Sequence, residues 1–343
     1  MDMTTPIPVA FKSGTTQIYY HADFDLLRTI APPERSIIIT DENLKQYYTE
    51  ELKSWRTITL PPGEKTKTLE TIENVLWWLI DWEADRNTII VGFGGGVISD
   101  LTGFAAAIYK RGLRCGFMPT SILGMTDAAI GGKNGVNLAD YKNMAGIIRQ
   151  PEFLLYHFEV LQTLPQAEWI NGFAEIIKHA CIKDPDLFHL LEQHQLEDFK
   201  QDENLLRQIV SRNVAIKTDI VQQDEAENNE RKLLNFGHTF GHAAENSYQL
   251  PHGHAVAIGI IMACKISEKI FGFAATARVQ RLLEQYQLPV SLRYDPDAIM
   301  SLITADKKRF RNGVDYILLK SVGQAVVQRI SVDELHVFFR EMQ

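Results

Sequence analysis

The chain is poor in cysteine. Only three cysteines occur among its 343 residues, Cys115, Cys181 and Cys264, and they are far apart in apolar surroundings. An odd and scattered set excludes a disulfide framework and a zinc knuckle built from paired cysteines. We therefore interpret all three as buried thiols and expect a cytoplasmic protein, because that compartment keeps thiols reduced.

Positive charge and long apolar runs are also scarce. A formal net charge of −8 argues against general affinity for nucleic acid. The longest apolar run, residues 255–264, is too short to span a bilayer, and the N-terminus has no basic stretch before an apolar core. We expect no nucleic-acid partner, no membrane partner and no signal peptide. The length is enough for two globular domains.

Short β-branched runs alternate with helical patterns in the first half of the chain. The patterns predict strands over residues 36–40, 56–60 and 87–92, and helices over 66–82 and 99–109. Strands and helices in this order form a parallel sheet. The first half is therefore predicted to be an α/β domain.

A glycine-rich turn, residues 94–96, follows the third predicted strand. Such a turn lets the backbone approach a pyrophosphate at a helix N-terminus, although Val97 stands where the third fingerprint glycine belongs. A tight structural turn is the alternative. With Asp41 as a candidate partner for a ribose hydroxyl, a dinucleotide is favoured. An NTPase P-loop is excluded at residues 131–133, because Asp127 replaces its first glycine.

The sequence pattern changes near residue 150, and the second half of the chain is predicted to be mainly helical. Ser331 and Glu334 form a capping box for the last helix. We expect a helix that starts at residues 163–166, with Thr163 as N-cap and Gln166 three positions later. Further helices are expected over residues 203–223, 254–270, 275–286 and 297–310, and a hairpin over 315–330 that turns near Gly323.

Residues 231–257 hold four of the ten histidines. His238 and His242 are four apart and share a face if they lie on a helix. Continued backwards, that face meets Asn235 and Arg231, so we expect one polar stripe of four residues. Leu233, Leu234, Phe236 and Phe240 then supply the packing, and Gly237 and Gly241 indicate close approach by another backbone or a ligand.

Two interpretations of these histidines are open. They are either capping and surface residues or, with His252 and His254 following, a metal site. A zinc protease is excluded, because Thr239 stands where its glutamate is required. Glu175 and Lys178 likewise form either a surface ion pair or, among apolar neighbours, a carboxylate that needs a cation or a metal.

A series of motifs in a fixed order then resembles one known family. The chain is similar to the 3-dehydroquinate synthases, of the sugar phosphate cyclase superfamily, from about Asp41 to Lys308. The matching motifs, besides the two histidine motifs, are P-G-E-K-T-K from Pro62, G-G-G-V-I-S-D from Gly94, P-T-S-I-L from Pro119, D-A-A-I-G-G-K-N-G-V-N from Asp127, K-N from Lys142, T-L-P from Thr163, G-F-A-E-I-I-K from Gly172 and D-K-K from Asp306.

The resemblance implies a fold and two cofactors. It implies a Rossmann-like NAD-binding domain with a parallel sheet over residues 1–152, and an all-α metal- and substrate-binding domain over 153–343, with the active site in the cleft between them. The implied metal is zinc or, alternatively, cobalt. Its implied ligands are Glu175, His238 and His252, and His254 remains an alternative to His252.

The resemblance also implies residue roles. The implied NAD contacts are Asp41, Asn43, Glu64, Lys67, Gly95, Gly96, Asp100, Thr120, Ser121 and Thr163. The implied catalytic and substrate contacts are Asp127, Lys133, Lys142, Asn143, Lys178, Lys217, Arg231, Asn235, His242 and one of Lys307 and Lys308. Arg111 matches an arginine that reaches the neighbouring subunit's site, which implies a homodimer.

The implied activity is a lyase reaction on a seven-carbon keto acid phosphate. NAD oxidises a hydroxyl transiently, phosphate is eliminated, the hydride returns, and an aldol closure gives the carbocycle. The rival functions are another sugar phosphate cyclase, a metal-dependent polyol dehydrogenase of related fold, and an inactive binding protein. The intact set of metal ligands and the intact set of lysines favour the implied 3-dehydroquinate synthase activity over these rivals.

Overall fold

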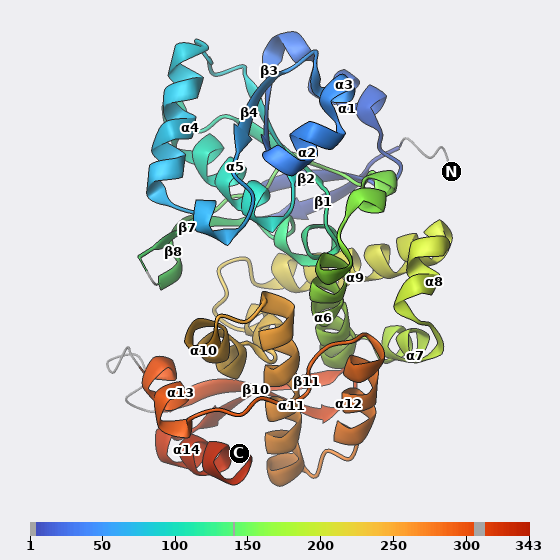
Figure 1. Cartoon of the computed structure of the whole chain (residues 1–343), viewed down its shortest axis with the longest axis vertical. Coiled ribbons are helices and arrows are strands. Elements are labelled where there is room, and N and C mark those ends of the chain that lie inside the picture. Colours follow the sequence, from blue (N-terminus) through green and yellow to red (C-terminus); the bar gives the residue numbers. More distant parts are fainter. Residues whose placement is uncertain (1–4, 140, 305–312) are drawn as a thin grey trace. The chain divides into compact units, whose positions relative to one another are not determined.

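The structure is a computed structural model that describes residues 5–139, 141–304 and 313–343 (Figure 1). The chain forms two compact units. The first comprises Met1–Pro165 and Lys217–Ala226, and the second comprises Gln166–Ile216 and Glu227–Gln343. The assignment of NAD to residues 1–152 and of the metal to 153–343 stays a prediction.

A seven-stranded sheet organises the first unit, in the order β1-β2-β9-β6-β5-β3-β4. All neighbouring pairs are parallel except β1 and β2. The predicted parallel sheet is confirmed, with an antiparallel edge that the sequence reading did not include. The strands are β1 (Ile7–Phe11), β2 (Gly14–Tyr19), β3 (Ser36–Asp41), β4 (Arg56–Leu60), β5 (Ile89–Gly94), β6 (Arg114–Pro119) and β9 (Phe153–Leu155).

The central strands of the sheet are buried on both faces, which is why their sequences are apolar without alternation. β5 is buried along its whole length, and β3 is buried up to its last residue. The α-helices of this unit are α1 (Phe24–Ile30), α2 (Glu42–Tyr47), α3 (Thr49–Leu52), α4 (Leu69–Asp81) and α5 (Gly96–Ile108). Both predicted helices exist, but α4 begins three residues late, after its cap Thr68, and α5 begins three residues early, at the end of the glycine turn.

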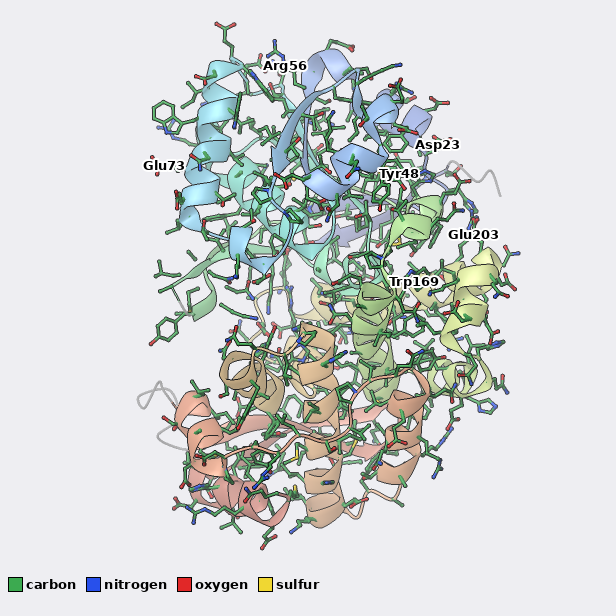
Figure 2. All side chains as sticks on the ribbon, viewed as in Figure 1. Asp23, Tyr48, Arg56, Glu73, Trp169 and Glu203 are labelled. Atoms are coloured by element: carbon green, nitrogen blue, oxygen red, sulfur yellow. The ribbon has the colours of Figure 1, made fainter. Side chains whose placement is uncertain are left out.

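Shorter elements complete the first unit. A separate antiparallel hairpin pairs β7 (Lys133–Leu138) with β8 (Tyr141–Ile148). The 3₁₀ helices are Pro33–Arg35, Glu64–Thr66, Tyr109–Arg111 and Phe158–Thr163, and Gly124–Ala128 is a π-helix. Tyr48, labelled in Figure 2, packs its ring 5.3 Å from that of Phe93, which ties the end of α2 to β5.

The second unit is helical, with one hairpin. β10 (Val314–Ser321) and β11 (Gln324–Ile330) turn at Gly323, which has φ +84°, so the predicted hairpin is confirmed. The helices are α6 (Gln166–Lys183), α7 (Pro185–Gln193), α8 (Leu196–Gln201), α10 (His238–Tyr248), α11 (His252–Phe271), α12 (Thr276–Gln285), α13 (Pro296–Ile303) and α14 (Val332–Glu341), with the 3₁₀ helix Glu230–Asn235 before α10. α9 (Glu203–Gln223) begins in this unit, and its residues from Lys217 onward belong to the first.

In the second half of the chain, two further predicted helix boundaries are wrong and one predicted cap is right. Thr163 does not cap α6: it ends a 3₁₀ helix, and its hydroxyl donates to the carbonyl oxygen of Val160. The helix predicted over residues 297–310 ends at Ile303, and residues 305–312 lie outside the described part of the chain. The capping box of Ser331 and Glu334 is confirmed at α14.

α10 and α11 approach each other closely at glycines. A Cβ atom at Gly241 would lie 3.0 Å from the carbonyl oxygen of Ala255, and one at Gly259 would lie 1.8 Å from that of Gly237. The prediction that Gly237 and Gly241 mark the approach of another backbone is confirmed. The expected packing residues beside them are buried, as are all three free cysteines.

The predicted single stripe of Arg231, Asn235, His238 and His242 is wrong. Arg231 and Asn235 lie in a short 3₁₀ helix, and α10 begins only at His238. Gly237 between them has φ +79°, a left-handed conformation that breaks the helix. His238 and His242 do share α10, and their ring centroids are 5.0 Å apart.

The apolar core of the helical unit surrounds α11, which packs against α6, α10, α12 and β10. Within the described ranges, no helix is both long and apolar enough to cross a bilayer. Trp169 of α6, labelled in Figure 2, is buried, and the ammonium of Lys200 lies 5.6 Å from its ring centroid.

Candidate functional site

Three helices of the second unit bring potential metal ligands together. Glu175 lies on α6, His238 begins α10, and His252 begins α11. One oxygen of Glu175, Oε1, is 3.4 Å from Nε2 of His238 and 3.1 Å from Nε2 of His252. The ligand atoms of the three side chains all lie within 4.8 Å of one another. Two imidazole nitrogens and one carboxylate oxygen are a donor set suited to zinc.

Glu175 has no exposed side-chain surface, and its second oxygen, Oε2, forms an ion pair with Lys178, itself only 2% exposed. The pair is therefore buried, and the surface-pair alternative is wrong. Burial alone would raise the pKa of Glu175, but Lys178 and His238 hold it well below its usual range. An ionised carboxylate is thus held in the interior beside cationic partners, which fits a cation site.

The two imidazoles are oriented through their other nitrogens. Nδ1 of His238 lies 3.1 Å from the carbonyl oxygen of Phe236, and Nδ1 of His252 lies 3.5 Å from Oε2 of Glu245. Burial lowers the pKa of His252, but hydrogen bonds with Glu175 and Glu245 outweigh it and raise the pKa to about 10. Both rings present Nε2 to Glu175, as ligation of a metal requires.

A second group of potential ligands overlaps the first. His242, Glu245 and His252 also place ligand atoms within 4.8 Å of one another. His254 joins no candidate metal group among the described residues. Burial lowers the pKa of His254.

In the first unit, predicted NAD contacts form a polar cluster. Lys67 pairs with Asp100 of α5 and donates to Oδ1 of Asn143 over 2.5 Å. Burial raises the pKa of Asp100 to about 6, against the opposing charge of Lys67. Asn137 connects the rest, accepting from the backbone N–H of Asn143 and donating to Glu64. The structure thus groups Glu64, Lys67 and Asp100 with Asn143.

The glycine turn lies where β5 runs into α5. Gly95 is the N-cap of α5 and Gly96 its first residue. A Cβ atom at Gly96 would lie 3.0 Å from Cβ of Ala128, so a side chain would crowd this turn. Thr120 and Ser121 lie alongside: Thr120 donates its N–H to the carbonyl oxygen of Gly94, and Oγ of Ser121 accepts from Gly124.

Other predicted NAD contacts lie at element ends of the same unit. Asp41 ends β3 and caps α2, where it accepts from the N–H of Leu44 over 3.0 Å. Burial raises the pKa of Asp41 although that hydrogen bond lowers it. Asn43 lies in α2, and Thr163 hydrogen-bonds with Tyr48. Asp41 therefore has a structural role as the N-cap of α2, and its contact with NAD stays a prediction.

The predicted substrate contacts of the first unit fall into two places. Lys217 pairs with the Asp127 carboxylate over 2.8 Å and donates to the Asp127 carbonyl oxygen over 2.7 Å. Lys133 begins β7 and Lys142 lies in β8, next to Asn143.

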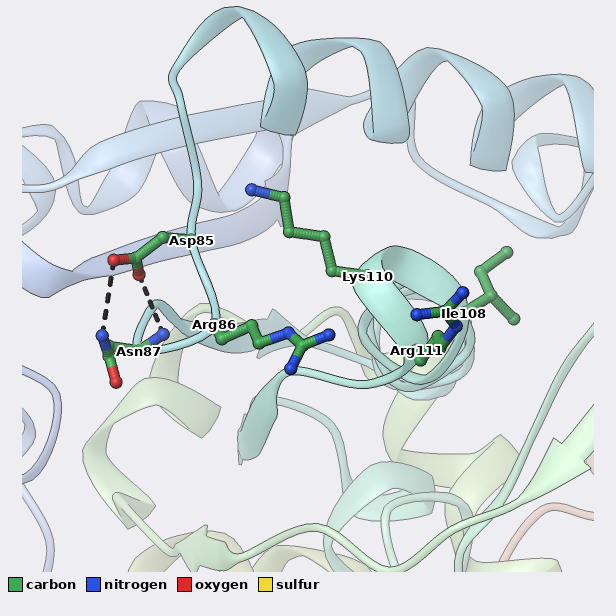
Figure 3. Close-up of a pocket in the computed structure, with 6 residues that line it drawn as sticks. All are labelled: Asp85, Arg86, Asn87, Ile108, Lys110 and Arg111. Carbon is green, nitrogen blue, oxygen red and sulfur yellow. Dashed lines mark hydrogen bonds between the residues drawn. The ribbon is translucent and has the colours of Figure 1, made fainter.

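Arg111 lies at an open surface pocket with Arg86 and Lys110 (Figure 3). Lys110, Arg111 and Gly112 all have positive φ, of 46°, 68° and 119°. This conformation is costly for residues with side chains. The strained turn thus brings Lys110 and Arg111 to a pocket that Arg86 and Asp85 also line.

The helical unit holds the remaining predicted contacts. Arg231 is 1% exposed, Asn235 donates to Glu227 over 2.8 Å, and the ring of His242 is exposed beside His238. Lys307 and Lys308 lie outside the described residues.

Sequence reasoning missed three side chains that support these groups. Glu245 faces His252, Asn137 connects Glu64 to Asn143, and Asn171 accepts from the N–H of Gly253. Glu245 follows His242 by three positions, a helical spacing that was visible in the sequence. The other two contacts are not local and left no signal of that kind.

Comparison with known proteins identifies the same family in both halves of the chain. Residues 57–171 match the 3-dehydroquinate synthase N-terminal family, and residues 172–309 match the 3-dehydroquinate synthase C-terminal family. The 3-dehydroquinate synthase of Dehalococcoides mccartyi (strain CBDB1) is 39% identical over 316 residues, 88% of each chain. That of Pyrococcus abyssi (strain GE5 / Orsay) is 36% identical, over 88% of this chain and 90% of its own.

A solved structure shares the fold. The 2-epi-5-epi-valiolone synthase of Streptomyces hygroscopicus subsp. jinggangensis 5008, with NAD⁺ and Zn²⁺ bound, superposes with a TM-score of 0.88 and 26% identity, over 97% of this chain and 98% of its own. The predicted fold class and the family resemblance are both confirmed.

Proposed function

The chain belongs to the 3-dehydroquinate synthase family, and from that premise we propose that it converts 3-deoxy-D-arabino-heptulosonate 7-phosphate to 3-dehydroquinate and inorganic phosphate. This is a carbon–oxygen lyase reaction of the shikimate pathway, which supplies aromatic amino acids. Within the structure, the observation that carries the proposal is the buried group of Glu175, His238 and His252.

We assign the metal to that group. The Zn²⁺ of the valiolone synthase structure supports zinc, and Co²⁺ suits the same nitrogen and oxygen donors. Three protein ligands leave a coordination position for a substrate oxygen. Lys178 balances the second oxygen of Glu175, so the carboxylate stays ionised and available.

We assign NAD to the glycine turn and its surroundings, and the NAD⁺ of the valiolone synthase structure supports this. Backbone N–H groups at the start of α5 favour a pyrophosphate there. NAD held there would supply reversible hydride transfer with a substrate hydroxyl, and a metal held by Glu175, His238 and His252 would supply polarisation of the oxygen concerned. The assigned contacts are Asp41, Asn43, Glu64, Lys67, Gly95, Gly96, Asp100, Thr120, Ser121 and Thr163.

We assign the cationic and amide side chains to the two anionic groups of the substrate. Arg231 suits the carboxylate, because its planar fork pairs with two oxygens at once. The carboxylate side comprises Lys178, Lys217 and Arg231, and the phosphate side comprises Lys133, Asn143, Asn235, His242 and one of Lys307 and Lys308. Asp127 orients Lys217 through their ion pair, and Lys142 lies beside Asn143 in β8.

We further propose a cytoplasmic homodimer. Three buried, free cysteines fit a reducing compartment. The strained turn that presents Arg111 beside Arg86 and Lys110 fits a role in binding an anion at the neighbouring subunit. Light scattering on the purified protein measures the oligomeric state, and a monomer would remove this part of the proposal.

One assay tests the function. Purified protein with Zn²⁺ and catalytic NAD should release one phosphate per substrate consumed and form 3-dehydroquinate, identified by mass spectrometry, with no net NADH. Stoichiometric NADH would establish a polyol dehydrogenase instead. Turnover of a sugar phosphate without a carboxylate, but not of the keto acid, would establish a different cyclase.

Arg231→Lys sharpens the substrate assignment. It should weaken binding of the carboxylate-bearing substrate by about 1.5–3 kcal/mol, the range for hydrogen bonds to charged groups, and leave inorganic phosphate binding nearly unchanged. Calorimetry measures both affinities, with the exposed Arg293→Lys as the matched control. Equal losses for both ligands would remove Arg231 from the carboxylate side.

A further inference from the structure

His252 lies between two carboxylates of different elements. Its Nε2 is 3.1 Å from Oε1 of Glu175, and its Nδ1 is 3.5 Å from Oε2 of Glu245. Glu175 has no exposed side-chain surface and that of Glu245 is 8% exposed, whereas that of His252 is 29% exposed. One carboxylate is thus on the side of the proposed metal, and the other is on the opposite side of the ring.

The backbone fixes this arrangement. Glu245 lies on α10, which begins with His238, and His252 begins α11. The two helices are in close backbone contact at Gly241 and Ala255, so Glu245 is carried by a rigid pair of elements. On the other side, Asn171 of α6 accepts from the N–H of Gly253. His252 therefore has little freedom to turn away.

His238 offers an internal comparison. Its Nδ1 lies 3.1 Å from a backbone carbonyl oxygen, that of Phe236, while its Nε2 also faces Glu175. An imidazole that binds a metal through Nε2 must carry its proton on Nδ1, and an acceptor there selects that tautomer. His238 has a neutral acceptor that no side-chain change can remove, whereas His252 has an acidic one.

We infer that Glu245 is a positioning residue: its carboxylate accepts a hydrogen bond from Nδ1–H of His252 and so holds the tautomer and ring orientation in which Nε2 binds the metal. The inference rests on the metal site of the proposed function. Its rival is direct ligation, because Glu245 also belongs to the second group, with His242 and His252. The negative charge of Glu245 also raises the basicity of the His252 imidazole, so that Nε2 donates its electron pair to the metal more strongly.

Metal affinity and the spectrum of the cobalt form separate these roles. Glu245→Ala should weaken Zn²⁺ binding by about 10- to 100-fold, the usual effect of losing such a partner, measured by competition with a chromophoric chelator. Co²⁺ should still bind with the same coordination number, visible in the intensity of its d–d bands. Glu245→Gln keeps an acceptor oxygen without the charge, so its loss should be smaller than that of the alanine variant. Glu284→Ala, an exposed glutamate of α12, is the matched control and should bind metal like the wild type.

A second readout covers the case in which Glu245→Ala does not fold. In zinc-loaded protein labelled with ¹⁵N-histidine, the wild type should show a protonated Nδ1 on His252, and Glu245→Gln should shift that resonance. Unchanged affinity and unchanged resonance in Glu245→Gln would overturn the inference, as would Co²⁺ bands showing a lost ligand in either variant. Failure of the wild type to bind Zn²⁺ or Co²⁺ would instead overturn the proposed metal site.

Discussion

Glu175 in the helical unit and Asp100 in the α/β unit are both carboxylates paired with a lysine, yet their pKa values move in opposite directions. Glu175 is the more deeply buried, and its pKa lies well below the usual range. Burial raises the pKa of Asp100 to about 6, although Lys67 opposes that shift. Depth of burial therefore does not decide the protonation state by itself.

The difference comes from the number of positive partners. Glu175 has Lys178 on its own helix, three residues away, and two imidazoles from α10 and α11. Asp100 has Lys67, whose ammonium also donates to Asn143, and the weaker influence of Lys217, while the nearby Glu64 raises its pKa further. The first environment keeps a permanent anion ready for a cation. The second leaves a carboxylate that changes charge near neutral pH.

The largest expected effect is that of removing the anion of the helical unit. Glu175→Gln leaves the ammonium of Lys178 buried without a counter-ion, and breaking a buried pair in this way costs about 3–5 kcal/mol. The unfolding free energy of metal-free protein, measured with chelator and urea, should fall by that amount. Bound zinc, measured by atomic absorption, should fall to background.

Glu168→Gln is the control, since Glu168 is exposed on the same helix. It should change neither stability nor zinc content. Full zinc occupancy in Glu175→Gln would show that the carboxylate is not a ligand. The difference drawn between Glu175, as an anion that binds a cation, and Asp100 would then be lost.

A smaller effect, with a defined sign, is expected at Asp100. Its folded-state pKa of about 6 lies above the ordinary 3.8, so its contribution to stability is complete below about pH 4 and is lost as the pH rises through 6. Asp100→Asn does not titrate. The unfolding free energy of the wild type minus that of the variant should therefore fall between pH 4 and pH 7, by about 1–3 kcal/mol after allowance for partial exposure of the side chain.

Urea unfolding at several pH values measures this difference, with the exposed Asp81→Asn as control. A difference that rises with pH would mean that Lys67 outweighs burial. Asp100 would then resemble Glu175, and the comparison between the two units would fail.

The sequence predicted much of this fold because the signals were local. The buried strand at residues 36–40 and the hairpin turning at Gly323 were readable from residue types and spacing. The meeting of Glu175 with His238 and His252 was anticipated through the family resemblance and not through spacing, because three helices supply them.

What failed depended on backbone conformation or on burial. The stripe through Arg231 failed because Gly237 adopts φ +79°, and spacing alone cannot show where a helix breaks. The raised pKa of Asp100 also has no sequence signature. It follows from packing between α5 and residues more than thirty positions away, a distance in sequence that no local pattern spans.

The smallest expected effect concerns Asn143, the second partner of Lys67. Asn143 has φ +55°, so glycine keeps the backbone conformation while removing the acceptor oxygen. Asn143→Gly should cost about 1–2 kcal/mol of unfolding free energy, near the value of one hydrogen bond to a charged group. Asn143→Ala should cost about 1–2 kcal/mol more than Asn143→Gly, because alanine tolerates the left-handed region poorly, whereas glycine and asparagine both adopt it.

Combining Asn143→Gly with Asp100→Asn tests whether Lys67 needs both partners. The ammonium is nearly buried, and losing both acceptors should cost more than the sum of the single losses, by about 0.5–3 kcal/mol of coupling free energy. In the helical unit, by contrast, Lys178 pairs with the same carboxylate that faces two imidazoles, so a single change already disrupts the group. Strictly additive losses at Asn143 and Asp100 would mean that water solvates Lys67 in the variants. The α/β cluster would then be a set of independent contacts, because a shared buried cation requires that its partners be coupled.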